Sequence, residues 1–228
     1  MSIDDDVVSG YWNWSHSLTP NDHLPESNSL INNSDPTVAF LVEPAHMPAN
    51  ASATVTLDCT IRSDQRLLIP VWAAWCDSSE ASSGSLLDEA KKRYNLGHIV
   101  SEVRVDDSLY ANLDVIVCKK GNNVTVTYAS KGQQNVTEHS TANEFDLTIP
   151  SGSYKATNQG GSMGIVNIGR HKAASHGWWV VVPALSRGQH KVSYHTRVTT
   201  NDLPQGCETS GGSPPFTSAD ITYNLQVQ

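Results

Sequence analysis

Hydrophobic and polar residues alternate along most of this chain, in short runs separated by Gly, Pro, Asn and Ser. A period of two places successive side chains on opposite faces of a strand, so such runs predict half-buried β-strands. The predicted strands are Thr37–Val42, Thr54–Ile61, Arg66–Trp72, Ile99–Val105, Asn112–Cys118, Asn123–Ala129, Glu144–Ile149, Trp178–Val182, Gln189–Val198 and Asp220–Val227. Together they predict an all-β protein, a two-sheet antiparallel β-sandwich of jelly-roll type.

Turn residues between these runs predict two tight hairpins. Lys119–Asn122 separates two alternating runs and is expected to close the first one. Pro183–Gly188 separates the apolar run Trp178–Val182 from the alternating run His190–Val198. This second break predicts a β-hairpin within one antiparallel sheet.

Helical features are confined to one segment. Leu86–Leu96 repeats apolar residues at helical spacing, Ser85 precedes it as a capping residue, and Gly97 follows it as a stop signal. Before residue 37 the chain combines an acidic start, an aromatic cluster and a Pro/Asn/Ser-rich stretch without a clear period. We therefore expect an irregular N-terminal segment, residues 1–36, packed on a single β-sandwich domain of residues 37–228 that carries one short helix.

Composition narrows the classes of function. Charged residues make up 17% of the chain, and Ser, Thr, Asn and Gly, which close turns through side-chain and backbone geometry, are abundant. The formal net charge is −8, and no basic stripe is present that could neutralise phosphates, so we expect no nucleic-acid partner. No apolar run approaches the roughly 20 residues of a membrane span, so none is expected.

Cysteines and sequons favour an extracellular or cell-surface protein. The cysteine count is even and contains no Cys-x-x-Cys pair, which favours two disulfides of undetermined pairing over a zinc or redox site. The four cysteines are Cys59, Cys76, Cys118 and Cys207. The candidate glycosylation sites are Asn13, Asn32, Asn50, Asn123 and Asn135. The first residues lack the basic and apolar parts of a signal peptide, so a cytoplasmic protein with free thiols is the alternative.

The order of several motifs resembles that of a known group of proteins. These motifs are Trp12-x-Trp14, Cys59 followed by Leu67–Pro70, Val105-Asp106-Asp107, Phe145–Leu147, Gly177-Trp178-Trp179, Pro183–Ser186 with Gly188-x-His190, and Thr222–Val227. In this order the chain resembles a group of secreted microbial β-domain proteins to which no activity is assigned. The resemblance covers most of the chain and implies a single extracellular β-domain, but it implies no catalytic residue.

A nucleophile-elbow motif lies in a long glycine-rich loop predicted at Lys155–His176. Gly160–Gly164 fits Gly-x-Ser-x-Gly, which requires a strand before it, a helix after it, and an acid between the serine and a later histidine. No Asp or Glu occurs between Met163 and His195, the last histidine of the chain. A flexible loop is therefore favoured over a serine hydrolase of this type.

Histidines are the remaining catalytic candidates. His171 and His176 fall in the predicted loop, whereas His190 and His195 lie an odd number of positions apart on a predicted strand and should face opposite ways. A site could be built from both loop histidines and one strand histidine and be closed by Asp106 or Asp107. The candidate catalytic residues are thus His171, His176, His190 and Asp106. Their spacing matches no metal-ligand motif, and we expect neither a metal nor another cofactor.

Tryptophans are the candidate ligand-binding aromatics. Six of them occur in the close pairs Trp12/Trp14, Trp72/Trp75 and Trp178/Trp179, and most are expected in the core. The strand period places Trp178 and Trp179 on opposite faces, and we assign Trp178 to the core and Trp179 to the surface. Trp179, His176 and His190 are therefore predicted to bind a ligand beside the glycine-rich loop.

These observations favour a non-catalytic extracellular β-sandwich protein that serves surface assembly or binds a carbohydrate or protein partner. Two alternatives remain open. One is a metal- or His/carboxylate-dependent enzyme with its site beside the loop at residues 155–176. The other is a self-assembling filament or coat subunit, a homo-oligomer formed by edge-strand pairing with the apolar C-terminal strand as the natural donor.

Overall fold

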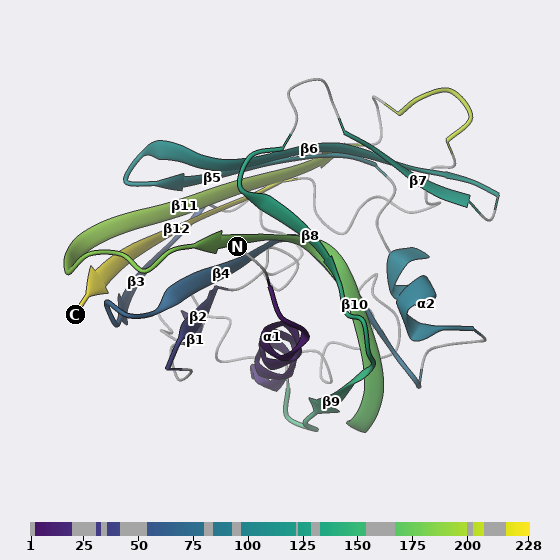
Figure 1. Ribbon diagram of the computed structural model, residues 1–228, viewed down its shortest axis with the longest axis horizontal. Helices are drawn as coiled ribbons and strands as arrows, with labels where there is room; N and C mark the ends of the chain where they lie inside the picture. The colour runs from purple at the N-terminus through teal and green to yellow at the C-terminus, as the bar shows by residue number, and fades with distance from the viewer. Residues whose placement is uncertain are drawn as a thin grey trace.

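Two β-sheets face one another in the computed structural model, with one helix on each side of the longest strand (Figure 1). The structure describes residues 3–19, 31–32, 36–41, 54–79, 84–92, 97–121, 123–128, 133–153, 167–199, 203–207 and 218–228. This arrangement confirms the predicted all-β two-sheet sandwich.

Among the described residues, each sheet has six strands. The first sheet runs β1 (Ile31–Asn32), β2 (Val38–Leu41), β4 (Arg66–Asp77), β10 (Gly169–Val182) and β8 (Val136–Ser140), and β9 (Phe145–Ile149) also pairs with β10. The second sheet runs β3 (Thr54–Ile61), β12 (Ser218–Val227), β11 (Gly188–Thr199), β5 (Gly97–Val105), β6 (Ser108–Lys120) and β7 (Asn123–Tyr128). The helices are α1 (Asp5–Ser17) and α2 (Leu86–Lys92).

Strand pairing is mostly antiparallel, with two exceptions. β2 pairs with β4, and β3 pairs with β12, in parallel. The predicted Lys119–Asn122 turn does join the antiparallel neighbours β6 and β7, because Lys120 pairs with Asn123. Local turn signals were sufficient there, since a two-residue turn fixes both partners and their direction.

The predicted hairpin at Pro183–Gly188 is wrong. β10 belongs to the first sheet and β11 to the second, so the chain crosses from one sheet to the other between them (Figure 1). A hairpin turn and a crossing between sheets use the same Pro- and Gly-rich residues. The sequence therefore located the break correctly but did not reveal its geometry.

The main core fills the space between the two sheets. Trp178 from the first sheet and Tyr194 and Tyr223 from the second are among its largest fully buried side chains. α2 extends this inner layer, because Leu86 and Ala90 pack with Cys76 and Ala174. Ser85 caps α2 as predicted, its Oγ accepting a hydrogen bond from Asp88 N at 3.1 Å.

A second core lies on the outer face of the first sheet, beneath α1. The prediction of an irregular segment before residue 37 is wrong here, because Val8, Tyr11, Trp12 and Ser15 repeat at helical spacing and form the buried face of α1. Asp5 and Asp6 lie in the first turn, where their negative charges interact favourably with the positive end of the helix dipole. Because α1 covers it, the outer face of the first sheet is a packed interior and not a solvent-exposed surface.

Trp179 lies at the centre of this second core. The ring centroid of Tyr11 lies 5.2 Å from that of Trp179, in an edge-on contact, and the ring of Trp12 also meets Trp179 edge-on. Trp178 and Trp179 point to opposite faces as expected, but each face is covered and both side chains are 0% exposed. The assignment of Trp179 to the surface is therefore wrong.

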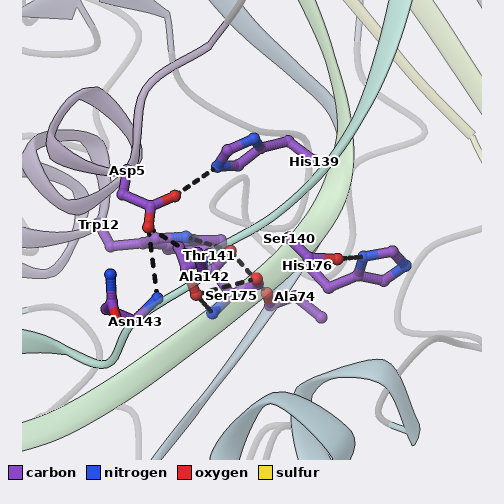
Figure 2. A network of polar contacts seen from close by, with 10 residues as sticks. All are labelled: Asp5, Trp12, Ala74, His139, Ser140, Thr141, Ala142, Asn143, Ser175 and His176. Carbon is purple, nitrogen blue, oxygen red and sulfur yellow. Dashed lines mark hydrogen bonds and ion pairs between the residues drawn. The ribbon is translucent and has the colours of Figure 1, made fainter.

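Polar contacts fasten α1 to the strands below it (Figure 2). Near its start, Asp5 Oδ1 lies 3.0 Å from His139 Nε2, and Asp5 Oδ2 accepts a hydrogen bond from Ala142 N at 2.9 Å. Near its middle, Trp12 Nε1 donates to Ser175 Oγ at 2.7 Å. These bonds fix the position of α1 along the sheet, which aromatic packing alone would leave less well defined.

Truncation of either neighbouring tryptophan should strongly destabilise the protein. Trp178→Ala and Trp179→Ala are each expected to lower the free energy of unfolding by about 3–5 kcal/mol, because each removes a fully buried ring. Urea denaturation of the two variants measures this change. Leu109→Ala, which truncates a side chain 44% exposed, is the control and should change it by less than about 0.5 kcal/mol. If Trp179→Ala lowered the free energy of unfolding no more than Leu109→Ala does, α1 would not cover the sheet in solution.

Candidate functional site

A groove of about 870 Å³ opens on the second sheet, near the turn between β5 and β6. We call it the polar groove. Its lining residues are Asp58, Cys59, Thr60, Asp106, Asp107, Gln189, His190, Lys191, Asn224, Leu225 and Gln226. They come from three neighbouring strands, β3, β12 and β11, and from the β5–β6 turn.

Strand alternation explains why polar side chains line the groove. On β3 and β12 the odd-numbered residues are buried in the main core, so Asp58, Asn224 and Gln226 face outward. Asn224 lies opposite Asp58 in the parallel pairing, and its Nδ2 donates to Asp58 Oδ1 at 2.8 Å. The groove floor is therefore a ladder of carboxylate and amide groups held in register by the sheet.

The Asp106–Asp107 turn forms one wall of the groove. Val105 pairs with Ser108, so these two residues make a two-residue hairpin, and both have positive φ, 49° and 64°. Asp tolerates this left-handed conformation better than most residues. Asp106 Oδ1 accepts a hydrogen bond from Lys191 N at 2.9 Å, which ties the turn to β11.

His190 and Asp106 are the two predicted site residues that the structure brings together. His190 Nδ1 lies 2.8 Å from Asp106 Oδ2, and His190 Nε2 lies 2.9 Å from the carbonyl oxygen of Ser186. Both ring nitrogens thus face acceptors, which favours the doubly protonated ring. The hydrogen bond to Asp106 raises the pKa of His190, and hydrogen bonds from Lys191 N and His190 lower the pKa of Asp106.

The groove carries more acidic than basic groups. Lys191 Nζ pairs with Asp107 Oδ1 at 2.8 Å, and His190 pairs with Asp106. Asp58 adds a third carboxylate, which accepts a hydrogen bond from the neutral side-chain amide of Asn224. Anionic ligands are therefore disfavoured in the groove.

Cys59 does not supply a nucleophile to the groove. Its side chain is buried in the main core, and burial together with the nearby charge of Asp58 raises the pKa of the thiol to about 11. The reactive form of cysteine is the thiolate, so this thiol is inert near neutral pH. Cys59 thus serves as an apolar core residue.

His171 and His176 lie on one strand rather than in a loop. Residues 169–176 belong to β10, so the predicted loop Lys155–His176 is wrong over that part, and residues 155–166 lie outside the described residues. The two histidines are an odd number of positions apart on β10, and no bulge lies between them. Their side chains therefore point to opposite faces of the sheet. His171 Nε2 lies 3.1 Å from Asn167 O, whereas His176 is buried on the inner face. They do not form one site.

The predicted aromatic platform is also absent from the described surface. All six tryptophans are described, and none is exposed: five are buried and Trp14 is half-buried. Of the three predicted ligand-binding residues, Trp179 and His176 are buried away from the groove, and only His190 lines it. Asp58 and Asn224 were missed, although their outward positions on alternating strands were readable from the sequence.

One disulfide joins Cys118 to Cys207, with a Cα–Cα distance of 5.2 Å. Cys59 and Cys76 are free and buried in separate apolar clusters, so the prediction of two disulfides is wrong. The even cysteine count was misleading because a buried free cysteine behaves as a small apolar side chain.

The part of the chain that the structure describes was searched for metal-binding clusters and for membrane-spanning helices. Those residues contain no group of three or more His, Cys, Asp or Glu side chains able to hold a metal ion. They also contain no helix that is both long and apolar enough to cross a membrane.

The sequons differ in accessibility. Asn123 and Asn135 are exposed and Asn32 is half-buried, while Asn50 lies outside the described residues. The Asn13 side chain is engaged with β9: Nδ2 donates to Asp146 O at 2.9 Å, and Oδ1 accepts from Thr148 N at 2.9 Å.

In a glycosylating host we expect a glycan at Asn123 and none at Asn13. Attachment at Asn13 Nδ2 would disrupt its bond to β9, whereas Asn123 is exposed at the start of β7. Peptide mass spectrometry after enzymatic deglycosylation in water labelled with heavy oxygen measures occupancy at each site, because each glycosylated asparagine becomes a labelled aspartate. Occupancy at Asn13 with none at Asn123 would contradict the docking of α1 on β9.

The His190 ring should titrate above its ordinary pKa of 6.5. Because the folded-state pKa is raised, the stabilisation from the His190–Asp106 pair is fully present below pH about 6.5 and is lost as pH rises through the folded pKa. NMR titration of the ring should show Asp106→Asn lowering the pKa of His190. Asp220→Asn, which removes the partner of His195 on the same strand, is the control and should leave the His190 titration unchanged. A His190 pKa that is the same in Asp106→Asn as in wild type would contradict the pairing of His190 with Asp106.

Comparison of the chain with protein-family models, with curated proteins and with solved structures found no match. What the protein binds or catalyses therefore has to follow from its own geometry.

Proposed function

We propose that the protein is an extracellular or cell-surface β-sandwich that binds a neutral, polyhydroxylated ligand, such as an oligosaccharide, in the polar groove, which serves as a non-catalytic binding site. The observation that carries this proposal is the ladder of outward Asp, Asn and Gln side chains across β3 and β12. Carboxylates and amides offer paired donors and acceptors at fixed spacing. Such groups suit the vicinal hydroxyls of a sugar.

The charge and the shape of the groove support a neutral ligand. Asp58, Asp106 and Asp107 would repel an anionic ligand, and the two basic groups already pair with two of these carboxylates. The groove is open rather than enclosed by apolar walls, and a ligand held there would be bound chiefly through hydrogen bonds. Polar ligand contacts of this kind fix orientation and specificity more than affinity.

An extracellular location is consistent with the Cys118–Cys207 disulfide. Disulfides persist in oxidising compartments and are rare in the cytosol. The bond closes a long stretch of chain, with a sequence separation of 89 residues, and constrains the unfolded state accordingly. Assembly with a protein partner remains the alternative use of the same surface.

Isothermal titration calorimetry with neutral hexaoses tests the proposal, using gluco-, xylo- and manno-oligosaccharides as probes. We expect at least one to bind wild type, and Asp58→Ala and Asn224→Ala to weaken that binding by about tenfold or more, since each loses polar contacts with the ligand. Arg197→Ala, on β11 but outside the groove lining, is the control and should bind like wild type.

Two results would overturn the proposal. One is the absence of binding to all three neutral hexaoses. The other is binding that survives both groove substitutions, which would place the ligand elsewhere on the molecule.

A further inference from the structure

A buried histidine lies away from the polar groove, on the inner face of β10. His176 is 6% exposed and falls between Ala174, which packs beneath α2, and Trp178, which packs in the main core. Figure 2 shows its ring pointing away from α1, with Ser140 beside it. Its position is therefore the junction between α2 and the edge of the sandwich.

Strand register brings Ser140 directly against His176. The two residues are partners in the antiparallel pairing of β8 with β10. At the adjacent pair, Thr141 N donates to Ser175 O, so Ser140 and His176 form a non-hydrogen-bonded pair, in which side chains approach most closely. Ser140 Oγ lies 2.7 Å from His176 Nδ1.

A carboxylate faces the other ring nitrogen. Glu138 lies two residues before Ser140 on β8 and so shares its face, and Glu138 Oε1 is 3.5 Å from His176 Nε2. Glu138 is itself oriented by the second sheet: Tyr128 OH donates to Glu138 Oε2 at 2.7 Å, and Trp178 Nε1 donates to Tyr128 OH at 3.2 Å. The hydroxyl, the imidazole and the carboxylate thus lie in one row, with a hydrogen-bond distance between the first two groups and an ion-pair distance between the last two.

The surroundings of His176 suit a neutral base. Burial lowers the pKa of its ring, and the charges of Lys91 on α2 and of the neighbouring His139 act in the same direction. The charge of Glu138 and a hydrogen bond with the backbone of His139 oppose that shift. A neutral imidazole with Nε2–H toward Glu138 directs the Nδ1 lone pair at the Ser140 hydroxyl, whose proton it can accept. Glu138, 40% exposed, marks the side from which solvent reaches the chain of groups.

We propose that Ser140, His176 and Glu138 form a nucleophile, base and orienting carboxylate that hydrolyse a small carboxylic ester. The proposal is independent of the polar groove. Nucleophile and base lie within hydrogen-bond reach, and a third group orients the base, which is the arrangement that activates a serine. Ser140 and His176 are the catalytic residues, and Glu138 is a positioning residue.

The chemistry has two balanced steps. Ser140 Oγ adds to the ester carbonyl carbon while its proton passes to His176 Nδ1. The bond between the carbonyl carbon and the alcohol oxygen then breaks, and His176 donates that proton to the alcohol oxygen. Water next adds to the acyl group on Ser140, passing a proton to His176. The carboxylic acid leaves as Ser140 Oγ regains its proton. By strand alternation the Ser140 N–H points away from β10, toward the sheet edge, where it can donate to the developing oxyanion.

Hydrolysis of 4-nitrophenyl acetate by the full chain tests the proposal. We expect Ser140→Ala and His176→Gln to lower kcat/KM by about 10²–10⁴-fold. Ser193→Ala, which removes another half-buried strand serine outside this cluster, is the control and should retain wild-type turnover. Circular dichroism melts establish that each variant is folded. Because Ser140→Ala only removes a hydroxyl, it remains the decisive variant if His176→Gln does not fold.

Two further readouts separate catalysis from a purely structural hydrogen bond. A fluorophosphonate probe should add one phosphonyl group to wild type at Ser140, identified by peptide mapping, and none to Ser140→Ala. Glu138→Gln should move the acidic limb of the kcat/KM profile to lower pH, because the carboxylate that raises the pKa of His176 is lost. Turnover by wild type no faster than by Ser140→Ala, or labelling at another residue, would overturn the proposal.

Discussion

Burial of both faces of β10 is the constraint on which the rest of this structure depends. Eight consecutive residues, Ala173–Val180, are buried, because the second sheet and α2 cover the inner face and α1 covers the outer face. A strand covered on both sides holds its neighbours in one register, since a slip by one residue would exchange the two faces. That fixed register places Ser140 against His176 on one side and Ser175 against Trp12 on the other.

The two candidate sites use the same strand geometry in opposite ways. In the polar groove, outward residues of three neighbouring strands present polar groups to solvent. At His176, inward polar residues meet where the inner layer changes from the second sheet to α2. Burial supplies a low dielectric at the second site, which strengthens each hydrogen bond there.

The strands were predictable because a period of two is a local property, and β3 begins and ends where the alternation does. α1 was missed because the aromatic cluster at residues 11–14 was interpreted as part of an irregular segment, although the buried residues from Val8 to Ser15 have helical spacing. The structural role of the Gly177-Trp178-Trp179 motif depends on contacts with residues far away in the sequence, so it could not be predicted locally. A Cβ on Gly177 would lie 2.6 Å from that of Ala73, and the two tryptophans serve separate cores. Likewise, the contact of Ser140 with His176 depends on a pairing across 36 residues, which no local pattern encodes.

Docking of α1 has a consequence for the order in which the protein is built. Trp12 and its hydrogen-bond partner Ser175 are separated by 163 residues, so α1 leaves the ribosome long before β10 has been translated. Contacts of such long separation form slowly, because a large loop must close before they contribute. Until then Tyr11 and Trp12 stay accessible to chaperones and to other nascent chains. α1 is thus synthesised well before β10 but is among the last elements to reach its native position.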